Sequence, residues 1–452
     1  MSNQAKLATL REHALPLSTD DDLDAVLDHI GDASLVLLGE ATHGTRDFYR
    51  LRADLSKRLI VERGFDAIAV EADWPDALQV SRFVQLCGSD QTADQALSGF
   101  ERFPQWMWRN EEVVDLLYWL RLHNQHVQDA GRRIGFFGID LYSLHKSIQS
   151  VVHYLDKADP EAAGRARERY SCFDHVAMDP QRYGYLTSFG LRPDCEEAAV
   201  RQLAELTAQA QQHMRRPGAS VPDELFYAQQ NARVAQNAES YYRAMFSTRD
   251  ASWNIRDTHM ADTLDALRAH IAQRKSGPAK LVVWAHNSHL GDARATEMGK
   301  GGQINLGQLM RERHGEEAVY LLGFSTYDGT VTAASDWEAP VQLKRVRPAL
   351  PDSVEALMHA LSKEAPSTLG RFLLPMRGRP AVQQALPASL LERAIGVVYR
   401  PETERVSHYF DVELARQFDA LIHVDSSSAL RPLELSSHWT MEDLPETYPS
   451  GL

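Results

Sequence analysis

Seven short apolar segments recur along the chain, and each ends in polar or charged residues. They cover residues 34–39, 66–70, 133–138, 280–284, 318–323, 395–399 and 420–424. Each segment is a nearly unbroken hydrophobic run and does not alternate apolar with polar positions. Such runs are typical of strands buried on both faces, as in a parallel sheet covered by helices. The pattern therefore predicts a largely parallel central sheet.

Helical periodicity separates these segments. Residues 49–63 carry aliphatic side chains on one face and are followed by Gly64, a residue suited to end a helix. Residues 113–126 form a second such segment, and an apolar stripe from Met260 to Ile271 marks a third. Alternating strands and helices predict an α/β fold with helices flanking the sheet.

The alternation breaks between about residues 145 and 255, where helical patterns follow one another directly. The helices predicted there cover residues 145–155, 195–216 and 222–246. We therefore expect a helical insertion at 145–255 that caps the crevice at the strand ends, and an α/β catalytic core formed by 1–144 and 256–452. In the last part of the chain, 329–335 is a further candidate strand, whereas 339–387 is predicted to hold short helices and Pro-containing loops.

Composition and charge narrow the class of protein. The 452 residues are 44% hydrophobic and 24% charged, which is ordinary for a globular protein. A net charge of −14 argues against a general nucleic-acid binder. The three cysteines, Cys87, Cys172 and Cys195, are widely spaced, so we predict neither a disulfide framework nor a structural zinc site and expect a reducing environment.

Targeting signals are not evident in the sequence. The first residues, MSNQAKLATLREHALPL, lack the apolar core of a signal peptide, and no segment approaches the about 20 apolar residues that span a bilayer. The prediction is a cytoplasmic protein without a membrane partner. The sequence does not determine the oligomeric state.

Acidic and histidine side chains follow four of the predicted strands. They are Glu40 and His43 after 34–39, Glu71 and Asp73 after 66–70, Asp140 after 133–138, and His286 and His289 after 280–284. The carboxyl ends of parallel strands share one edge of a sheet, where ligands bind. We therefore expect these side chains to line one crevice.

A structural role is the alternative for each of these residues. An acid directly after a strand often caps the next helix, which applies to Asp73 and Asp140. A single histidine is more often a hydrogen-bonded core or surface residue than a catalyst. The pair Glu40 and His43 favours function, because burying both side chains costs desolvation free energy unless they are partnered.

Several well-known catalytic motifs are missing. Residues 323–327 (GFSTY) begin like a GxSxG elbow but end in Tyr, and no HExxH, P-loop or GxGxxG sequence occurs. The cysteines do not follow the predicted strands. By elimination, a histidine with neighbouring carboxylates would activate water as a general base, which suits a side chain with a pKa of about 6.5.

Three blocks resemble signatures of the erythromycin esterase family. They are LLGEATHGTRDFYRLRADLSKRLIVERGFDAIAVEADWPDA, NIRDTHMADTL and VVWAHNSHLGDARATEMG, and the resemblance covers most of residues 30–330. It implies hydrolysis of a carboxylic ester without a covalent intermediate; for the named members the ester is the macrolactone of erythromycin-type antibiotics. The expected partner is thus a small-molecule ester or lactone, with no cofactor.

The resemblance also implies roles for five residues. His43 matches the general base, and Glu40 and Glu71 match acids that orient the base or the water. Arg52 matches a basic residue of the site, and His286 matches a histidine that faces the same cleft. We expect Arg52 and His286 to stabilise the oxyanion.

Three further residues, His289, Asp73 and Arg256, are expected to contact the substrate, although Arg256 could instead pair with a nearby acid. Two other functions stay open at this point. The first is a metal-dependent hydrolase, whose N and O ligands would come from His43, Glu71, Asp140, His286 and His289. The second is a ligand-binding protein without catalysis.

Overall fold

The structure of the protein, a computed structural model, describes residues 2–19, 21–176, 180–214, 222–246, 249–275, 277–437 and 439. The strands are β1 Leu15–Pro16, β2 Leu35–Leu38, β3 Ala67–Asp73, β4 Gly135–Asp140, β5 Leu281–Trp284, β6 Val319–Ala334, β7 Val341–Val346, β8 Arg371–Pro375, β9 Leu390–Arg393, β10 Tyr409–Val412 and β11 Ala420–Ser427. The helices before β5 are α1 Asn3–His13, α2 Leu23–Ile30, α3 Arg46–Arg63, α4 Trp74–Val84, α5 Ala93–Leu97, α6 Glu111–Gln125, α7 Leu144–Ala158, α8 Pro160–Tyr170, α9 Pro180–Ser188, α10 Glu196–Met214, α11 Asp223–Ala244 and α12 Arg249–Ala272. Those after β5 are α13 Asn287–Leu290, α14 Glu297–Lys300, α15 Leu306–His314, α16 Val354–Lys363, α17 Pro366–Leu369, α18 Pro380–Ala385, α19 Glu404–Ser407 and α20 Leu414–Gln417.

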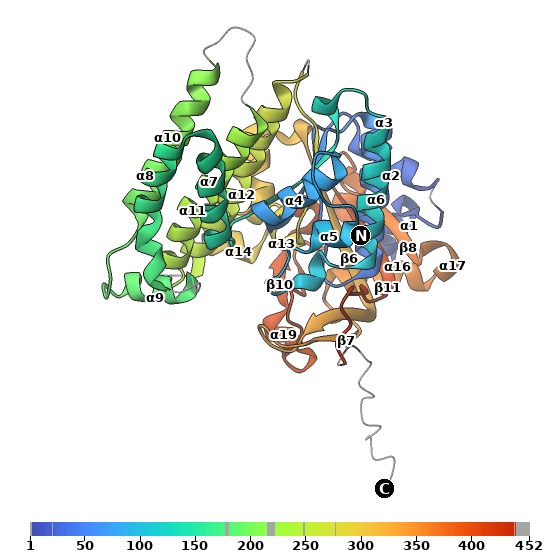
Figure 1. Ribbon diagram of the computed structural model, residues 1–452. Coiled ribbons are helices and arrows are strands. Elements are labelled where there is room, and N and C mark those ends of the chain that lie inside the picture. Colours follow the sequence, from blue (N-terminus) through green and yellow to red (C-terminus); the bar gives the residue numbers. More distant parts are fainter. Residues whose placement is uncertain are drawn as a thin grey trace.

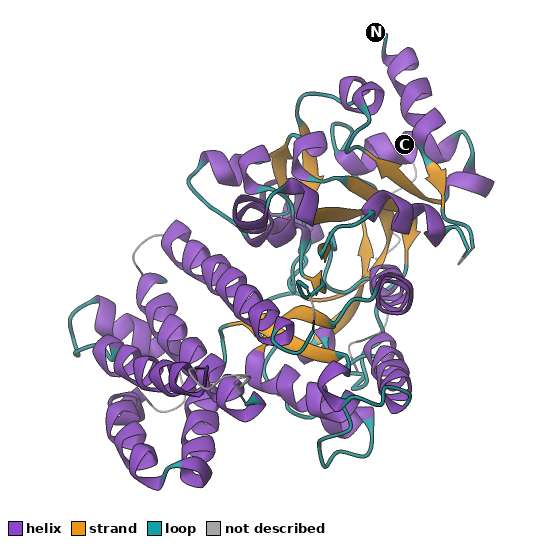
Figure 2. Ribbon diagram, turned by 90° about the horizontal axis from the view of Figure 1, so that it is seen from above, coloured by secondary structure: helices purple, strands orange, loops and turns teal. Residues whose placement is uncertain are grey.

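One mixed sheet forms the centre of the molecule. Among the described residues it has nine strands in the order β1-β8-β11-β6-β2-β5-β3-β4, with β7 paired to the second half of β6. The strands from β11 to β4 run parallel to their neighbours, and β8 and β1 add an antiparallel edge. Helices lie on both sides of this sheet (Figure 2). The predicted α/β class with a largely parallel sheet is confirmed.

Both faces of the sheet are buried, as the unbroken apolar runs require. Along β2, Leu35 and Leu37 join one hydrophobic cluster, whereas Val36 and Leu38 join the other. Residues of α12, α15 and α16 complete the first cluster, and residues of α2, α3 and α6 complete the second. This burial explains why the central strands lack a polar face.

The ends of the flanking helices follow local rules. Helix α3 ends at Gly64, which adopts the left-handed conformation (φ 67°) that favours glycine. Helix α6 begins after Asn110, whose side chain accepts a hydrogen bond from the backbone N–H of Val113. Both helices lie within three residues of the predicted positions.

Helices α7 to α12 connect β4 with β5 and gather on one side of the sheet (Figure 1). They include the predicted helical region, although α12 crosses the boundary expected at residue 255 and contributes to the core under the sheet. The division into core and cap stays a prediction. None of the helices that the structure describes, these long ones included, is apolar enough over a sufficient length to cross a membrane.

The cysteine prediction is wrong for two of the three residues. Cys172 and Cys195 form a disulfide within the helical region, and Cys87 is free and exposed. The 23-residue separation gave no sign of the pairing, because helices α8 and α10 pack together and bring the two positions to a Cα–Cα distance of 6.0 Å.

Three strand predictions in the last part of the chain need correction. The run 395–399 forms no strand and makes only isolated bridges, such as that of Ile395 with Thr42. The candidates 318–323 and 329–335 belong to a single strand, β6. Strands β7 and β8 were missed inside the region assigned to short helices and loops, because strands of five or six residues beside prolines carry little periodic signal.

Candidate active site

A cavity of about 430 Å³ lies at the carboxyl ends of β2, β3, β4 and β5. Seven of the residues singled out in the sequence line it: His43, Glu71, Asp73, Asp140, Arg256, His286 and His289. Its other walls are largely aromatic and apolar, from Phe100, Phe103, Pro104, Met107, Trp108, Tyr142, Trp253 and Trp337. Distant segments thus meet at one edge of the sheet, as the position of the strand ends predicts.

His43 is held from behind by a buried carboxylate. Its Nδ1 donates to Glu40 Oε1 at 2.9 Å, and Arg52 Nη2 donates to Glu40 Oε2 at 2.6 Å. Glu40 is 2% exposed and Arg52 1% exposed, and the guanidinium lies 4.5 Å from the ring of Tyr49 and 4.7 Å from that of Trp284. With Nδ1 engaged by the carboxylate, Nε2 of His43 is the nitrogen left to accept a proton.

Arg52 occupies a different place from the one expected. It binds Glu40 behind His43 and does not line the cavity. A donor to a substrate oxyanion must reach the reacting atoms, so the expected oxyanion role does not fit this position. What Arg52 does is fix the orientation of the Glu40 carboxylate.

His286 lies beside His43, with 4.9 Å between the ring centroids. The backbone N–H of Ser288 donates to His286 Nδ1 at 3.2 Å, so the neutral ring carries its proton on Nε2. Burial, assisted by the charge of His43, lowers the pKa of His286 to about 3, and the charge of Glu71 and the backbone carbonyl of Ala41 offset this effect only in part. His286 therefore presents a buried Nε2–H donor that has no partner among the described residues.

Arg256 joins the remaining predicted residues into one network. It donates to both oxygens of Asp140, at 3.0 and 2.6 Å, and to Glu71 Oε1 at 2.6 Å, and it lies 3.0 Å from His289 Nε2. Glu71 Oε2 accepts from the backbone N–H of His286 at 2.8 Å. Glu71 thus supports the loop of His286, and Glu40 is the acid that bonds to the His43 ring.

The charge state of Glu71 follows from these neighbours. Burial would raise its pKa, but the charges of His289 and Arg256 outweigh burial and hold the pKa below the usual range. The pKa of Asp140 is lowered in the same way, since Arg256 outweighs its burial. Both carboxyl groups are ionised at neutral pH.

The sequence interpretation missed the residues that hold His289. Its Nδ1 lies 2.9 and 3.0 Å from the two oxygens of buried Asp257, and its ring stacks on Trp253 at a centroid distance of 4.5 Å. Trp253, Arg256 and Asp257 all come from α12. Trp253 and Asp257 are four residues apart, the spacing that places side chains on one helix face, and this was the signal that could have identified them.

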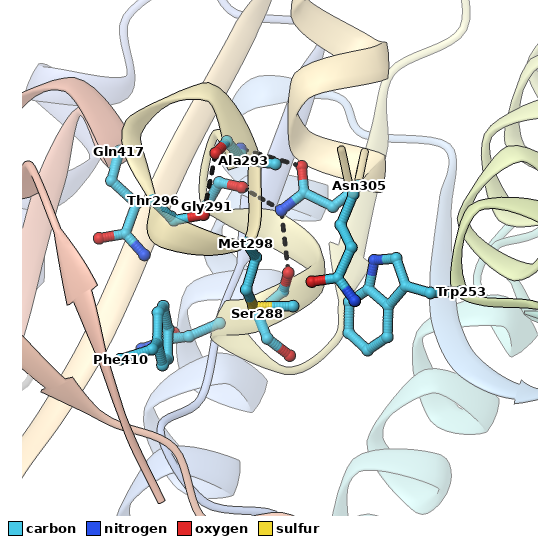
Figure 3. Close-up of a pocket in the computed structure, with 11 residues that line it drawn as sticks. Trp253, Ser288, Gly291, Ala293, Thr296, Met298, Asn305, Phe410 and Gln417 are labelled. Atoms are coloured by element: carbon cyan, nitrogen blue, oxygen red, sulfur yellow. Dashed lines mark hydrogen bonds between the residues drawn. The ribbon is translucent and has the colours of Figure 1, made fainter. Parts of the chain in front are cut away.

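The loop that follows β5 is braced on its far side. Figure 3 shows Asn305 beside this loop, with Nδ2 donating to the carbonyls of Ser288 (2.9 Å) and Gly291. Asn305 Oδ1 accepts from the backbone N–H of Ala293 at 3.2 Å. The indole N–H of Trp253 donates to the carbonyl of Ile304 at 2.8 Å. These bonds fix the backbone that carries His286 and His289.

Asp73 lies on another wall of the cavity. It stands at the N-cap position of α4, but its side chain makes no capping hydrogen bond. Its Oδ2 instead accepts from Arg102 Nη2 at 2.9 Å, a partner that the sequence did not indicate. The helix-cap interpretation therefore does not account for Asp73.

Metal binding has no evident ligand set here. Within the described part of the chain, no group of three or more His, Cys, Asp and Glu side chains is arranged to hold a metal ion. Among the five residues considered as ligands, Glu71 and Asp140 are bonded to Arg256, and His289 contacts it too. A guanidinium at the centre of the group occupies the place that a cation would take.

Comparison with known proteins agrees with the sequence motifs. The chain is 21% identical over 439 residues to YbfO of Bacillus subtilis (strain 168), described as a hydrolase, covering 92% of this chain and 90% of that protein. It is 24% identical over 323 residues to erythromycin esterase type II of Escherichia coli, covering 69% and 74%. The fold is similar to that of an erythromycin esterase mutant in its open conformation, with a TM-score of 0.61, 18% identity and coverage of 93% and 96%.

The family profile described as Erythromycin esterase matches residues 60–427. The matched segment runs from within α3 to the end of β11 and includes the ends of β3, β4 and β5 that carry most of the cavity. Since this match covers well over half of the chain, the protein belongs to the erythromycin esterase family and is a hydrolase of the esterase type.

Proposed function

We propose that this protein hydrolyses a carboxylic ester or lactone with a water molecule that His43 activates as a general base. The observation that carries the proposal is the buried chain Arg52–Glu40–His43, which ends at the cavity. A carboxylate on Nδ1 keeps the ring in the tautomer whose Nε2 is basic and stabilises the imidazolium that forms, as the orienting acid of a catalytic triad does.

The reaction then follows in two proton transfers. His43 Nε2 takes a proton from water while the water oxygen bonds to the ester carbonyl carbon, and the carbonyl oxygen becomes an oxyanion. When the tetrahedral intermediate collapses, the bond from carbon to the alkoxide oxygen breaks. The proton on His43 passes to that leaving oxygen, so the base returns to its starting state.

His286 is the proposed oxyanion donor in place of Arg52. Its Nε2–H is buried, lacks a hydrogen-bond partner among the described residues and belongs to a ring that lines the cavity next to His43. A neutral donor in a site shielded from water typically contributes about 3–4 kcal/mol to transition-state stabilisation. The low pKa of His286 keeps it neutral at physiological pH.

A serine nucleophile has weaker support. Ser325 Oγ lies 2.9 Å from His423 Nδ1, and His423 Nε2 lies 3.2 Å from Asp425, an arrangement that resembles a triad. Ser325 is only 1% exposed and His423 is fully buried, and neither lines the cavity. A substrate cannot reach this serine without local unfolding, so we take the group as structural.

The test is hydrolysis of a panel of macrolides, smaller lactones and simple esters, followed by mass spectrometry. Turnover adds one water, about 18 Da, and in ¹⁸O-labelled water the new carboxylate carries the label. We expect His43→Asn to abolish turnover, while His153→Asn, at an exposed position of α7, keeps it. Activity of His43→Asn equal to that of the wild type refutes the proposal, and loss of activity with a chelator favours the metal-dependent alternative.

A further inference from the structure

A second cavity, of about 30 Å³, lies at the opposite edge of the sheet from the candidate active site. It is bordered by the segments that precede β3 and β4, by the start of α11 and by the end of α12. Helix α12 connects the two sites, and Arg256 of the first and His270 of the second are about 21 Å apart along its axis. The titratable side chains that line the second cavity include Asp66, Arg132, Arg133, Asp223, His270, Arg274 and Lys275.

Both acids at this cavity already have cationic partners. Lys275 Nζ donates to the two oxygens of Asp66, at 2.9 and 2.7 Å. Asp223 accepts from Arg274, and His270 Nε2 lies 2.8 Å from the same oxygen of Asp223. Neither carboxylate is therefore free to neutralise a further cation.

The other two cations of the lining, Arg132 and Arg133, form no ion pair within the described part of the chain. Arg133 Nη1 donates to the backbone carbonyl of Gln85 at 2.9 Å. Its Nε is buried and has no hydrogen-bond partner among the described residues. Arg132 is exposed. The cavity is thus lined by two guanidiniums whose charge no neighbouring carboxylate balances.

Two other acids occur in the bordering segments, but neither lines the cavity. Asp129 is exposed, and its side chain accepts from the backbone N–H of Gly131 at 3.0 Å. Glu224 accepts from Arg82 at 3.0 and 2.8 Å. Among the lining side chains, four Lys and Arg cations face two carboxylates, which leaves an excess of two positive charges.

His270 adds an unsatisfied nitrogen at the same cavity. The residue is 4% exposed, and its ring stacks on Phe226 at a centroid distance of 3.9 Å. Its Nδ1 is buried and has no hydrogen-bond partner among the described residues. Buried polar atoms of this kind in folded proteins call for a specific explanation. Arg133 Nε and His270 Nδ1 together leave two hydrogen-bonding positions unused at one cavity.

We propose that this cavity binds a phosphate group, held by Arg132, Arg133 and His270. A volume of about 30 Å³ takes about two atoms of the size of an oxygen, so one edge of the anion enters and the rest stays on the solvent side. The excess of two positive charges matches a phosphate dianion, and guanidinium groups are well suited to phosphate oxygens.

The hydrogen-bonding capacity of phosphate also suits His270. Its oxygens accept from Nδ1 when this nitrogen carries the proton, and the O–H of hydrogen phosphate donates to Nδ1 when it does not. A carboxylate ion has one negative charge and no O–H, so it fits this cavity less well. The site lies apart from the candidate active site, and the inference does not depend on the proposed hydrolysis.

The test is calorimetric titration of the full-length protein with inorganic phosphate, in a phosphate-free buffer of fixed ionic strength. We expect one phosphate to bind per chain. Arg133→Gln should weaken binding about 10-fold or more, because it removes a hydrogen bond from a charged donor. Arg132→Glu should also weaken it, because the change reverses a charge at the cavity. Arg345→Gln, at an exposed position of β7, is the control and should leave the affinity unchanged.

Absence of binding, or binding that both Arg133→Gln and Arg132→Glu keep, overturns the proposal. If Arg133→Gln fails to fold, as judged by circular dichroism, Arg132→Glu decides. Binding that is lost in Arg102→Gln and kept in the other two variants places phosphate in the candidate active site and also overturns the proposal. Phenyl phosphate, titrated in parallel, distinguishes the sources: tighter binding than inorganic phosphate identifies a phosphate monoester as the ligand, and weaker binding identifies the free ion.

Discussion

The buried pair of Glu40 and Arg52 makes stability and catalysis separable. Replacing Glu40 by Gln leaves the Arg52 guanidinium, 1% exposed, without its carboxylate, and removing one partner of a buried ion pair costs about 3–5 kcal/mol of unfolding free energy. Arg52→Met leaves the buried Glu40 carboxylate without its guanidinium, at a comparable cost in unfolding free energy. If the two losses were independent, the double variant would lose about 6–10 kcal/mol. Because it contains neither charge, we expect it to lose about 3 kcal/mol or less.

The double variant should regain stability relative to Glu40→Gln but should not regain catalytic activity. Without the Glu40 carboxylate, the His43 ring loses the group that fixes its tautomer, and the comparable change in a serine-protease triad costs about 10⁴-fold in kcat. The double variant should therefore be as inactive as Glu40→Gln while being more stable than it. Urea denaturation gives the free energies, and turnover of an ester substrate gives kcat. The exposed pair Arg58 and Glu62, on the same helix, is the control and should show a coupling below about 1 kcal/mol. Additive losses in the Glu40/Arg52 cycle, or recovered activity in the double variant, would refute the reasoning.

Three other outcomes are expected. His286→Ala should lower kcat by about 10²–10³-fold with little change in KM, because it removes a donor needed only in the transition state. Steady-state kinetics that show an unchanged kcat would remove His286 from the mechanism. Folding lowers the pKa of Glu71, so this residue contributes its full stabilisation at pH values above its ordinary pKa of 4.5. The stabilisation is lost as the pH falls from 4.5 through the lower pKa of the folded state. The stability advantage of the wild type over Glu71→Gln, measured by urea denaturation, should thus shrink below pH 4.5, and a gap that is constant with pH contradicts the ion pairing. Thiol titration of the unfolded, unreduced protein should detect Cys87 alone, with Cys172 and Cys195 appearing after reduction; three reactive thiols before reduction would show that the disulfide is not formed.

Local patterns predicted the central strands well and the last part of the chain poorly. Strands β2 to β5 are apolar at almost every position because both sheet faces are covered, and that signal is present in the sequence alone. The run 395–399 is equally apolar, but only Ile395 and Tyr399 are buried, and the run makes isolated bridges to Thr42 and Ala334 without forming a strand. Hydrophobicity reports burial, and it does not by itself distinguish a strand from a packed loop.

In the candidate site, too, the sequence predicted some residues and missed others. Residues directly after strands could be placed at the sheet edge, because parallel strands end on the same side. Asp257 and Trp253 come instead from the first half of the long helix α12, where their four-residue spacing marks a shared helix face but does not show which strand end that face meets. Only the packing of α12 across the end of β4 brings them to His289. Arg102 lies in a loop and carried no periodic signal at all.

The sequence by itself determined the α/β class, the edge of the sheet at which the candidate site lies, and the family, since these depend on burial periodicity and short motifs. Only the tertiary structure decided which partner each acid contacts: Glu40 bonds to His43, whereas Glu71 bonds to Arg256 and the backbone of His286. It also moved Arg52 from the substrate to a position behind Glu40. The hydrogen bonds of Glu71 join positions 185 and 215 residues apart, so they depend on strand register and helix packing. Those of Glu40 with His43 and Arg52 are closer in the sequence, but their geometry of about 3 Å depends on how the loop after β2 turns into α3, which residue order alone does not encode.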